Sequence, residues 1–583
     1  MSRSPRQSES LGRYASVVEA ALGRLEADRA VQRIRAKDAA LWKSEETHQE
    51  VIRNSLGWLD VARIMRERAA GELKEFAVEM RDQGFTHLMV LGMGGSSLCP
   101  EVLRRTFGHA CGYPELLVLD TTDPDTIHSF EEHLDKRRTI FIVSSKSGTT
   151  IEPLSFYKYF FDRVRTLKGE RAGENFVAIT DPGTLMERMA REANFRRIFL
   201  NPSDIGGRYS ALSYFGMVPA ALMGIDVEEM LGRAVKMMDA CGASVHENQA
   251  ARLGAAMGAL ALEGRNKLTL LADPQVSSLG LWIEQLVAES TGKEGRGIVP
   301  VAGEPLGAPE VYGDDRLFVC ICVGETNEET DKKVRALEEA GHPVVRRVMN
   351  DALDLGAEFF TWEFATAVAG QLMKINPFDQ PNVQESKDNT NALLDKFKEQ
   401  GRLPEEKALV REGALTVYGI SGMEEARALS DTASLPSLLT EFLSKVKAGD
   451  YIALLAYIQE TPTHDELLQA IRTHLRDRLR VATTTGYGPR FLHSTGQLHK
   501  GGLKEALFLQ LTDEDHQDLP VPGEPYTFST LKEAQAIGDF SSLAKRNRRA
   551  LRIHLGSDAT EGLGKLLELL RAATLSDAQS SSA

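Results

Sequence analysis

The chain has 583 residues, of which 42% are hydrophobic, and its formal net charge is −14 at pH 7. This length predicts two or more domains, and the acidic balance argues against nucleic acid or an anionic membrane as the main partner. The five cysteines show no metal-binding spacing, and no uncharged apolar run is long enough to span a bilayer, so we expect a soluble, cytoplasmic protein.

Residues 1–74 carry apolar side chains at helical spacing, interrupted near residues 54–57, and this pattern predicts an N-terminal helical segment. From residue 87 onwards, short apolar runs alternate with helical stretches. Strands are predicted at residues 87–91, 116–120, 139–143 and 176–180. Such alternation is typical of a parallel sheet with helices on both faces, and we assign it to a first domain over residues 75–265.

A second series of strands and helices predicts a second domain over residues 266–575. Its strands are expected at residues 268–273, 316–323, 343–348, 450–457, 480–484, 505–511 and 551–555. A charged stretch near 388–413 indicates a surface excursion, and the tail 576–583 is expected to be disordered. The predicted fold class is α/β, with two three-layer αβα domains.

An anion site is indicated at residues 139–153, where a β-branched strand ends in a cluster of hydroxyls before a helix. Ser145, Ser147, Thr149 and Thr150 lie in this turn. Backbone N–H groups and hydroxyls at the start of a helix suit a phosphate. The alternative is a helix cap, which requires only one hydroxyl.

Two further loops are predicted at the same edge of the sheet, after the strands that end near Gly92 and Asp120. Gly92-x-Gly94 partly matches a dinucleotide-binding fingerprint. The third glycine is absent, because Ser97 stands in its place, and a second anion loop is not part of that motif. A smaller ligand than a dinucleotide is therefore favoured.

Other candidate residues lie between residues 206 and 293. Arg208 follows Gly206-Gly207, which lets the backbone approach a ligand, although most arginines pair with a carboxylate. Gln285 and Glu289 are separated by four residues on one predicted helix, so they share a face and can address one ligand. The alternative for Glu289 is a solvated side chain at a helix end.

Towards the C-terminus, Gln380 and Lys387 flank residues 382–386, and a lysine beside Glu385 is ordinarily a surface ion pair. His493 follows a predicted strand and lies close to His499 in sequence. The two histidines lack helical spacing and an accompanying carboxylate, so we expect no metal there.

Taken in order, these motifs resemble phosphoglucose isomerase, an enzyme of two sugar-isomerase domains, and in particular bacterial forms that include the isomerase part of transaldolase/phosphoglucose isomerase fusions. The resemblance rests on Gly92–Ser97, Ser145–Thr150, Gly206-Gly207-Arg208, the Glu289–Lys293 segment, Asn376–Gln380 with Lys387, and the surroundings of His493. Nothing in the chain resembles a transaldolase barrel.

The resemblance implies interconversion of glucose 6-phosphate and fructose 6-phosphate without a cofactor. The phosphate would be held by the four hydroxyls, and the sugar by residues that include Gly94, Ser96, Gly207, Gln285 and Gln380. Glu289 would move the proton, and Arg208 would stabilise an enediol intermediate. Lys387 and His493 would assist ring opening.

The position of the histidine departs from the family. It normally lies between the glutamate and the lysine, whereas His493 follows Lys387, as if parts of the second domain had been rearranged in sequence. The resemblance also implies a homodimer. Two other functions stay open: a phosphosugar isomerase that also accepts mannose 6-phosphate, and a sugar-phosphate sensor that binds without turnover.

Overall fold

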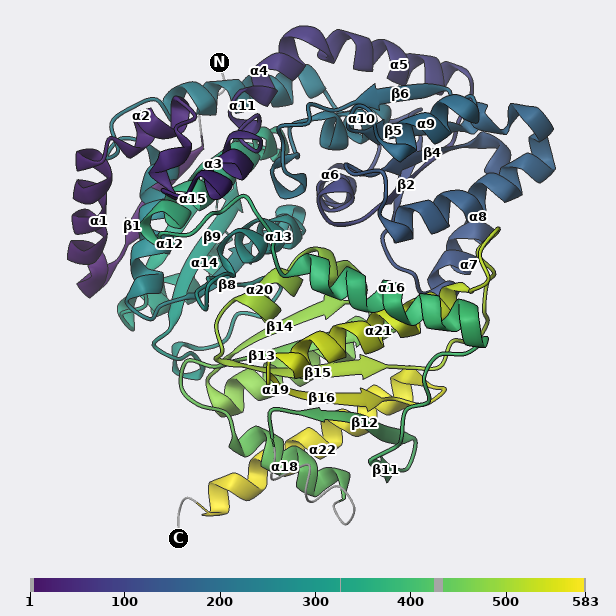
Figure 1. The fold of residues 1–583 in the computed structure, drawn as a ribbon. Coiled ribbons are helices and arrows are strands. Elements are labelled where there is room, and N and C mark those ends of the chain that lie inside the picture. Colours follow the sequence, from purple (N-terminus) through teal and green to yellow (C-terminus); the bar gives the residue numbers. More distant parts are fainter. Residues whose placement is uncertain (1–4, 326, 424–433, 581–583) are drawn as a thin grey trace. The chain divides into compact units, whose positions relative to one another are not determined.

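The structure is a computed structural model that describes residues 5–325, 327–423 and 434–580 (Figure 1). The chain divides into two compact units. The first unit consists of residues 1–120, 131–302 and 317–380, and the second of residues 121–130, 303–316 and 381–583.

The first unit begins with strand β1 (Arg6–Ser10) and five helices, which are α1 (Ala15–Ala27), α2 (Ala30–Arg35), α3 (Glu46–Arg53), α4 (Trp58–Arg68) and α5 (Ala70–Asp82). The predicted helices and their interruption near residues 54–57 are confirmed. β1 was not predicted, because its sequence, Arg-Gln-Ser-Glu-Ser, has no apolar residue. It forms by antiparallel pairing with a distant strand, β10.

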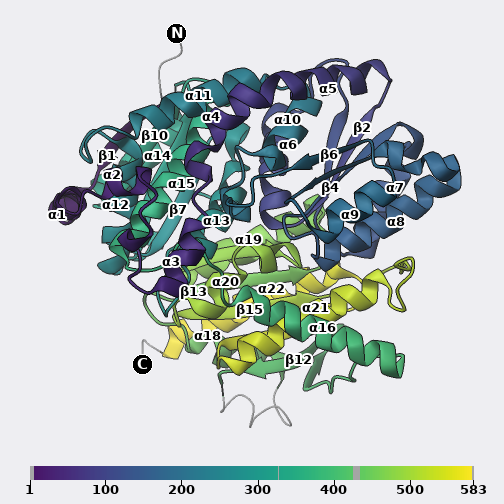
Figure 2. The ribbon, with the colours of Figure 1, turned by 45° about the horizontal axis from the view of Figure 1, so that its top comes forward.

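One parallel sheet of the first unit has the strand order β3-β2-β4-β5-β6. Its strands are β2 (His87–Gly92), β3 (Glu115–Leu119), β4 (Thr139–Ser144), β5 (Phe176–Thr180) and β6 (Arg197–Leu200). Helices α5, α6 (Leu98–Phe107) and α10 (Tyr214–Leu222) lie on one face, and α8 (Ile151–Lys168) and α9 (Leu185–Glu192) lie on the other (Figures 1 and 2). β6 was not predicted, because only one of its four side chains is fully buried.

The other sheet of the first unit has the order β1-β10-β9-β7-β8. Its remaining strands are β7 (Lys267–Ala272), β8 (Val299–Val301), β9 (Arg316–Val323) and β10 (Val344–Met349), and its helices are α11 (Val227–Ala240), α12 (Gln249–Leu262), α13 (Leu279–Thr291), α14 (Glu328–Glu339) and α15 (Leu355–Leu372). Almost every residue of α15 is buried, because α11, α12 and α13 pack around it.

The second unit contains one mixed sheet with the order β11-β12-β16-β15-β13-β14. Its strands are β11 (Val410–Glu412), β12 (Leu415–Ser421), β13 (Tyr451–Tyr457), β14 (Ala482–Tyr487), β15 (Ala506–Thr512) and β16 (Arg549–His554). β13 to β16 are parallel, whereas β11 and β12 are antiparallel additions at one edge. Its helices are α16 (Val383–Gln400), α18 (Leu435–Ser444), α19 (Pro462–Leu479), α20 (Gly496–Gly501), α21 (Phe528–Lys545) and α22 (Ala559–Ser580); α7 (Pro124–His133) crosses from the second unit into the first.

The α/β class with mostly parallel sheets between helices is confirmed. The described residues form three sheets rather than the two expected, and the strands of residues 266–575 divide between two of them. Apolar runs in the sequence indicate strands but not their pairing partners, so the strands of residues 266–575 were assigned to one domain. Among the described residues, none of the helices combines the length and the apolar character required to cross a bilayer.

Two smaller expectations also differ from the structure. Residues 388–400 are the greater part of α16, which packs on α21 with Thr390 against Gly538, so the first half of the charged stretch is a helix and not an excursion. Helix α22 continues to Ser580, so residues 576–580 are helical where disorder was expected. The last residues of that predicted tail, 581–583, lie outside the described residues.

Candidate active site

Two polar loops lie side by side at the carboxyl edge of the β3-β2-β4-β5-β6 sheet. β2 and β4 are parallel neighbours in which Gly92 pairs with Ser144. The chain then enters a short turn at Gly94–Ser96 after β2 and the hydroxyl-rich loop after β4. The predicted common edge of these loops is therefore confirmed, and it is the edge at which ligands bind in parallel sheets.

The four predicted hydroxyls converge in front of α8. Ser147 Oγ lies 3.1 Å from Thr149 Oγ1 and 3.5 Å from Thr150 Oγ1, and Ser145 Oγ lies 3.4 Å from Thr150 Oγ1. Thr150 is the N-cap residue, yet its side chain makes no capping hydrogen bond. The capping alternative therefore does not account for this cluster. The positive end of an 18-residue helix behind it favours an anion.

The turn after β2 contacts the segment that carries Arg208. A Cβ atom added to Gly95 would lie 1.9 Å from the carbonyl oxygen of Gly207 and 3.0 Å from the backbone nitrogen of Arg208. Only a glycine allows the two backbones to approach so closely. The neighbouring Gly94 has a positive φ of 55°, and Ser96 is buried. Gly94, Ser96 and Gly207 thus lie in one region, as the resemblance implies.

Arg208 is almost fully buried, with 2% of its surface exposed, and its guanidinium is held from several sides. Nε donates to Ser290 Oγ at 2.8 Å, and Nη1 donates to Gln380 Oε1 at 2.9 Å. Nη2 donates to the carbonyl oxygens of Pro377 and Asp379, both at 2.8 Å. These contacts fix the plane and direction of the cation. They also explain why Gln380 lies in the same site.

The carboxylate of Glu289 lies beside this cation. Its Oε1 is 3.2 Å from Nη1 of Arg208, and its Oε2 accepts a hydrogen bond of 3.2 Å from Gln285 Nε2. Gln285 and Glu289 therefore share a face of α13, as their spacing predicted. Glu289 is buried, so the alternative of a solvated side chain is wrong. Arg208 does pair with a carboxylate, but with that of the predicted catalytic glutamate.

Lys293 is part of this site, and the sequence analysis gave it no role. Its buried Nζ donates to the carbonyl oxygens of Asn376 and Asp379 and, at 2.6 Å, to Asp379 Oδ1. Burial and the nearby Arg208 lower the pKa of Lys293 to about 7, against the opposite effect of Asp379. Lys293 and Arg208 together hold the turn that ends at Gln380. The only signal in the sequence was its position in the Glu289–Lys293 segment.

The other two predicted catalytic residues belong to the second unit. Lys387 is exposed on α16, and His493 is half-buried at the end of the short 3-10 helix η10 (Arg490–His493) that precedes α20. Their segments are joined, because the Asn382 backbone N–H donates to Gln497 Oε1 and Gln497 Nε2 donates to Asn382 Oδ1, both at 2.8 Å. Two motifs that are 115 residues apart in sequence are therefore neighbours in this unit.

Glu385 and His499, which lie near Lys387 and His493 in sequence, have other surroundings in the structure. Glu385 pairs with Arg546 instead of Lys387. His499 is buried among Tyr451, Phe491 and Phe508, and burial lowers its pKa well below the usual value. It is thus a neutral core histidine.

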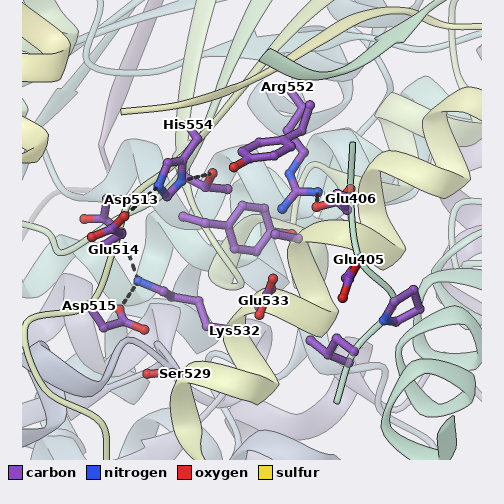
Figure 3. Close-up of a pocket in the computed structure, with 16 residues that line it drawn as sticks. Glu405, Glu406, Asp513, Glu514, Asp515, Ser529, Lys532, Glu533, Arg552 and His554 are labelled. Carbon is purple, nitrogen blue, oxygen red and sulfur yellow. Dashed lines mark hydrogen bonds and ion pairs between the residues drawn. The ribbon is translucent and has the colours of Figure 1, made fainter. Parts of the chain in front are cut away.

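The second unit also contains a cavity of about 650 Å³ at the carboxyl ends of β13, β15 and β16 (Figure 3). Acidic side chains outnumber basic ones in its lining, and they are Glu405, Glu406, Asp513, Glu514, Asp515 and Glu533. Burial raises the pKa of Asp513 to about 7 despite its contact with Lys532. A lining of this charge disfavours a sugar phosphate, so the hydroxyl loop of the first unit remains the better phosphate site.

The chain is similar in sequence to known proteins. The family model described as phosphoglucose isomerase matches residues 28–299. The glucose-6-phosphate isomerase of Rubrobacter xylanophilus is 31% identical over 370 residues, which cover 55% of this chain and 85% of that protein. The corresponding protein of Mycoplasmopsis pulmonis is 29% identical over 394 residues, which cover 58% of this chain and 90% of that protein.

Solved structures share the fold. A hypothetical protein from Thermus thermophilus superposes with a TM-score of 0.56 at 23% identity, and the match covers 67% of this chain and 99% of that chain. A glucose-6-phosphate isomerase from Chlamydia trachomatis gives a TM-score of 0.56 at 19% identity, covering 67% of this chain and 89% of that chain. The identity of 31% to the Rubrobacter xylanophilus protein, of which the match covers 85%, shows that the chain belongs to the phosphoglucose isomerase family.

Proposed function

We propose that the chain catalyses the reversible isomerisation of glucose 6-phosphate and fructose 6-phosphate. The observation that carries this proposal is the contact of 3.2 Å between Arg208 Nη1 and Glu289 Oε1, in which both side chains are buried. Aldose-ketose isomerisation needs a base and, beside it, a cation that stabilises the developing oxyanion. The family relatives carry the same activity in their names.

In the proposed mechanism, Glu289 removes the proton from C2 of the open-chain aldose. The C–H electron pair forms the C1–C2 double bond, and the carbonyl electrons of C1 move onto O1, where Arg208 stabilises the negative charge. Glu289 then returns the proton to C1 while the O2 hydroxyl passes its proton to O1, so that C2 becomes the ketone carbonyl and O1 a hydroxyl. The enediol intermediate is thus held between one carboxylate and one guanidinium.

The phosphate is assigned to the hydroxyls of Ser145, Ser147, Thr149 and Thr150, which supply donors at the start of α8. Ring opening is assigned to Lys387 and His493, following the family resemblance. The hydrogen bonds between Asn382 and Gln497 support this assignment, because they join the segments that carry the two residues. A cytoplasmic homodimer without a cofactor completes the proposal.

The test is proton exchange with solvent. Fructose 6-phosphate is incubated with the protein in D2O, and deuterium at C2 of the glucose 6-phosphate is measured by NMR. Glu289→Gln should abolish exchange while substrate binding stays nearly unchanged. Glu284→Gln is the matched control, because Glu284 lies on the same helix and has the same exposure of 8%. Exchange that persists in Glu289→Gln would place the base elsewhere.

The same assay tests the first alternative, and steady-state kinetics with mannose 6-phosphate test the second. A sugar-phosphate sensor would bind the substrate without incorporating deuterium in the unmodified protein. An isomerase of broader specificity would convert mannose 6-phosphate with a kcat/KM comparable to that for glucose 6-phosphate, since the proton-transfer groups would be the same.

A further inference from the structure

A group of side chains with potential metal-ligand atoms lies at the opposite, amino edge of the β3-β2-β4-β5-β6 sheet. His87 is the first residue of β2, Glu115 is the first residue of β3, and His133 is the last residue of α7. One potential ligand atom from each residue lies within 4.8 Å of the others. The three residues come from three different elements, so their convergence is a product of the fold and not of local sequence.

The sheet register accounts for two of the three positions. His87 and Glu115 are direct partners in the parallel pairing of β2 and β3, and partners of this kind point to the same face of a sheet. His133 completes the group from the helix, and the His87 and His133 rings meet edge to face with centroids 5.6 Å apart. His87 and Glu115 are half-buried and His133 is exposed, so an ion can enter from solvent.

The orientation of His87 is fixed by a second polar contact. The Thr86 hydroxyl lies 2.9 Å from Nδ1 of His87 and 3.4 Å from the carbonyl oxygen of Arg138. With Nδ1 donating to Thr86, and Thr86 donating to that carbonyl, the lone pair of Nε2 is left for a ligand. Support of one imidazole nitrogen by an outer hydrogen bond is characteristic of metal-binding histidines.

From this arrangement we propose that His87, Glu115 and His133 bind a divalent transition metal of the zinc type, with solvent at the remaining coordination position. Two imidazoles and one carboxylate suit zinc and its neighbours in the first transition series. They do not suit magnesium or calcium, which prefer oxygen ligands. Ligand atoms about 2.0–2.2 Å from zinc lie roughly 3.4 Å apart in a tetrahedron, so only small side-chain movements are required.

In the second unit, a cluster of carboxylates already contacts a cation of the protein itself. The described residues include one other group with suitable ligand atoms, which is Asp123, Asp513 and Asp515. There the ammonium of Lys532 contacts all three carboxylates, at 3.0 Å from Asp123 and 3.1 Å from Asp513. Figure 3 shows Lys532 with Asp513 and Asp515. A lysine thus supplies the cation. The group at His87 differs in its ligand types, because two of its three members are imidazoles.

The position of the metal site predicts its role. Five residue steps separate His87 from Gly92 on β2, which is about 16 Å at roughly 3.3 Å per residue. The metal therefore does not reach the loops assigned to the substrate. It joins the starts of β2 and β3 to the end of α7, so its binding should stabilise the folded chain and leave isomerase turnover unchanged.

The test is zinc titration of the full chain by calorimetry, after treatment with a chelator and its removal. We expect one zinc ion per chain and a higher melting temperature with zinc, and no response to Mg²⁺. His133→Ala removes an exposed side chain and should weaken zinc binding by more than about tenfold, and Thr86→Val should weaken it by about tenfold. His109→Ala, which removes another exposed histidine of the same unit, is the matched control.

Two further results decide the proposal. Co²⁺ should give the visible absorption bands of a tetrahedral nitrogen and oxygen complex, and His87→Ala should abolish them. Zinc affinity that is equal in the unmodified chain, His133→Ala and His87→Ala would overturn the proposal, as would a loss of affinity in His109→Ala of the same size as in His133→Ala.

Discussion

The close approach of Gly95 and Gly207 gives the sharpest test of how the candidate active site is built. Gly95→Ala would place a methyl group 1.9 Å from the Gly207 carbonyl oxygen, where real Cβ atoms keep at least 3.0 Å. One of the two backbones must therefore move by about 1.1 Å, the difference between these distances. Both are backbone segments, so no side-chain rotation relieves the clash.

The displacement should reach the catalytic groups directly, because Arg208 follows Gly207 and is held by hydrogen bonds of 2.8–2.9 Å. A misplacement of about 1 Å costs roughly 100-fold in rate, and overpacking costs about 1–3 kcal/mol of folding free energy. Gly206→Ala is the matched control, since its methyl group would meet only Tyr209, at 3.9 Å, in a backbone conformation that alanine adopts.

The assay measures kcat/KM for fructose 6-phosphate by coupling glucose 6-phosphate formation to a dehydrogenase, together with urea unfolding of the same samples. We expect Gly95→Ala to lose about 100-fold in kcat/KM and Gly206→Ala to stay near the unmodified value. Activity and stability of Gly95→Ala equal to those of the control would refute the close contact and the positioning of Arg208 that depends on it.

Three further predictions concern other parts of the chain. Arg208→Lys should lower kcat/KM by about 100-fold or more, because one ammonium cannot reproduce the guanidinium fork; steady-state kinetics near those of the unmodified chain would contradict this. Gln497→Leu should cost about 1–3 kcal/mol in urea unfolding, since it leaves the Asn382 N–H without its acceptor, and Asn382→Ala should cost less; the reverse order would contradict the paired hydrogen bonds. Burial raises the pKa of Glu363 well above its usual value of 4.5, so the folded chain holds this proton to a higher pH than the unfolded chain does. The free energy of unfolding therefore falls as the pH rises above that usual value. Glu363→Gln should therefore gain stability relative to the unmodified chain as the pH rises from 5 to 8, by at most about 1.4 kcal/mol per pH unit, and a difference independent of pH would show that this carboxyl does not change its proton affinity on folding.

Local patterns were sufficient for much of the fold. β2, β3, β4 and β5 of the first sheet were recognisable because a buried parallel strand is largely apolar, as in the run that precedes Ser145. The hydroxyl loop was recognisable because its residues are contiguous. The pairing of Gln285 with Glu289 followed from helical geometry alone. Each of these features depends on residues that are near one another in sequence, so periodicity and residue type determine them.

Contacts between distant segments needed the tertiary structure. β1 is polar and forms only because β10 offers an edge to pair with. Lys293 has no local signature, and its role depends on carbonyl oxygens that lie 83 and 86 residues further along the chain. The division of residues 266–575 between two sheets is of the same kind.

The sequence by itself determined the α/β class, most individual strands and helices, and the residue types of the candidate site. Only the tertiary structure decided which strands share a sheet, that Arg208 lies against Glu289, and that His87, Glu115 and His133 meet. The physical reason is that hydrophobic periodicity indicates whether a residue is buried. Which residue it contacts depends on how segments that are tens to hundreds of residues apart in sequence come together.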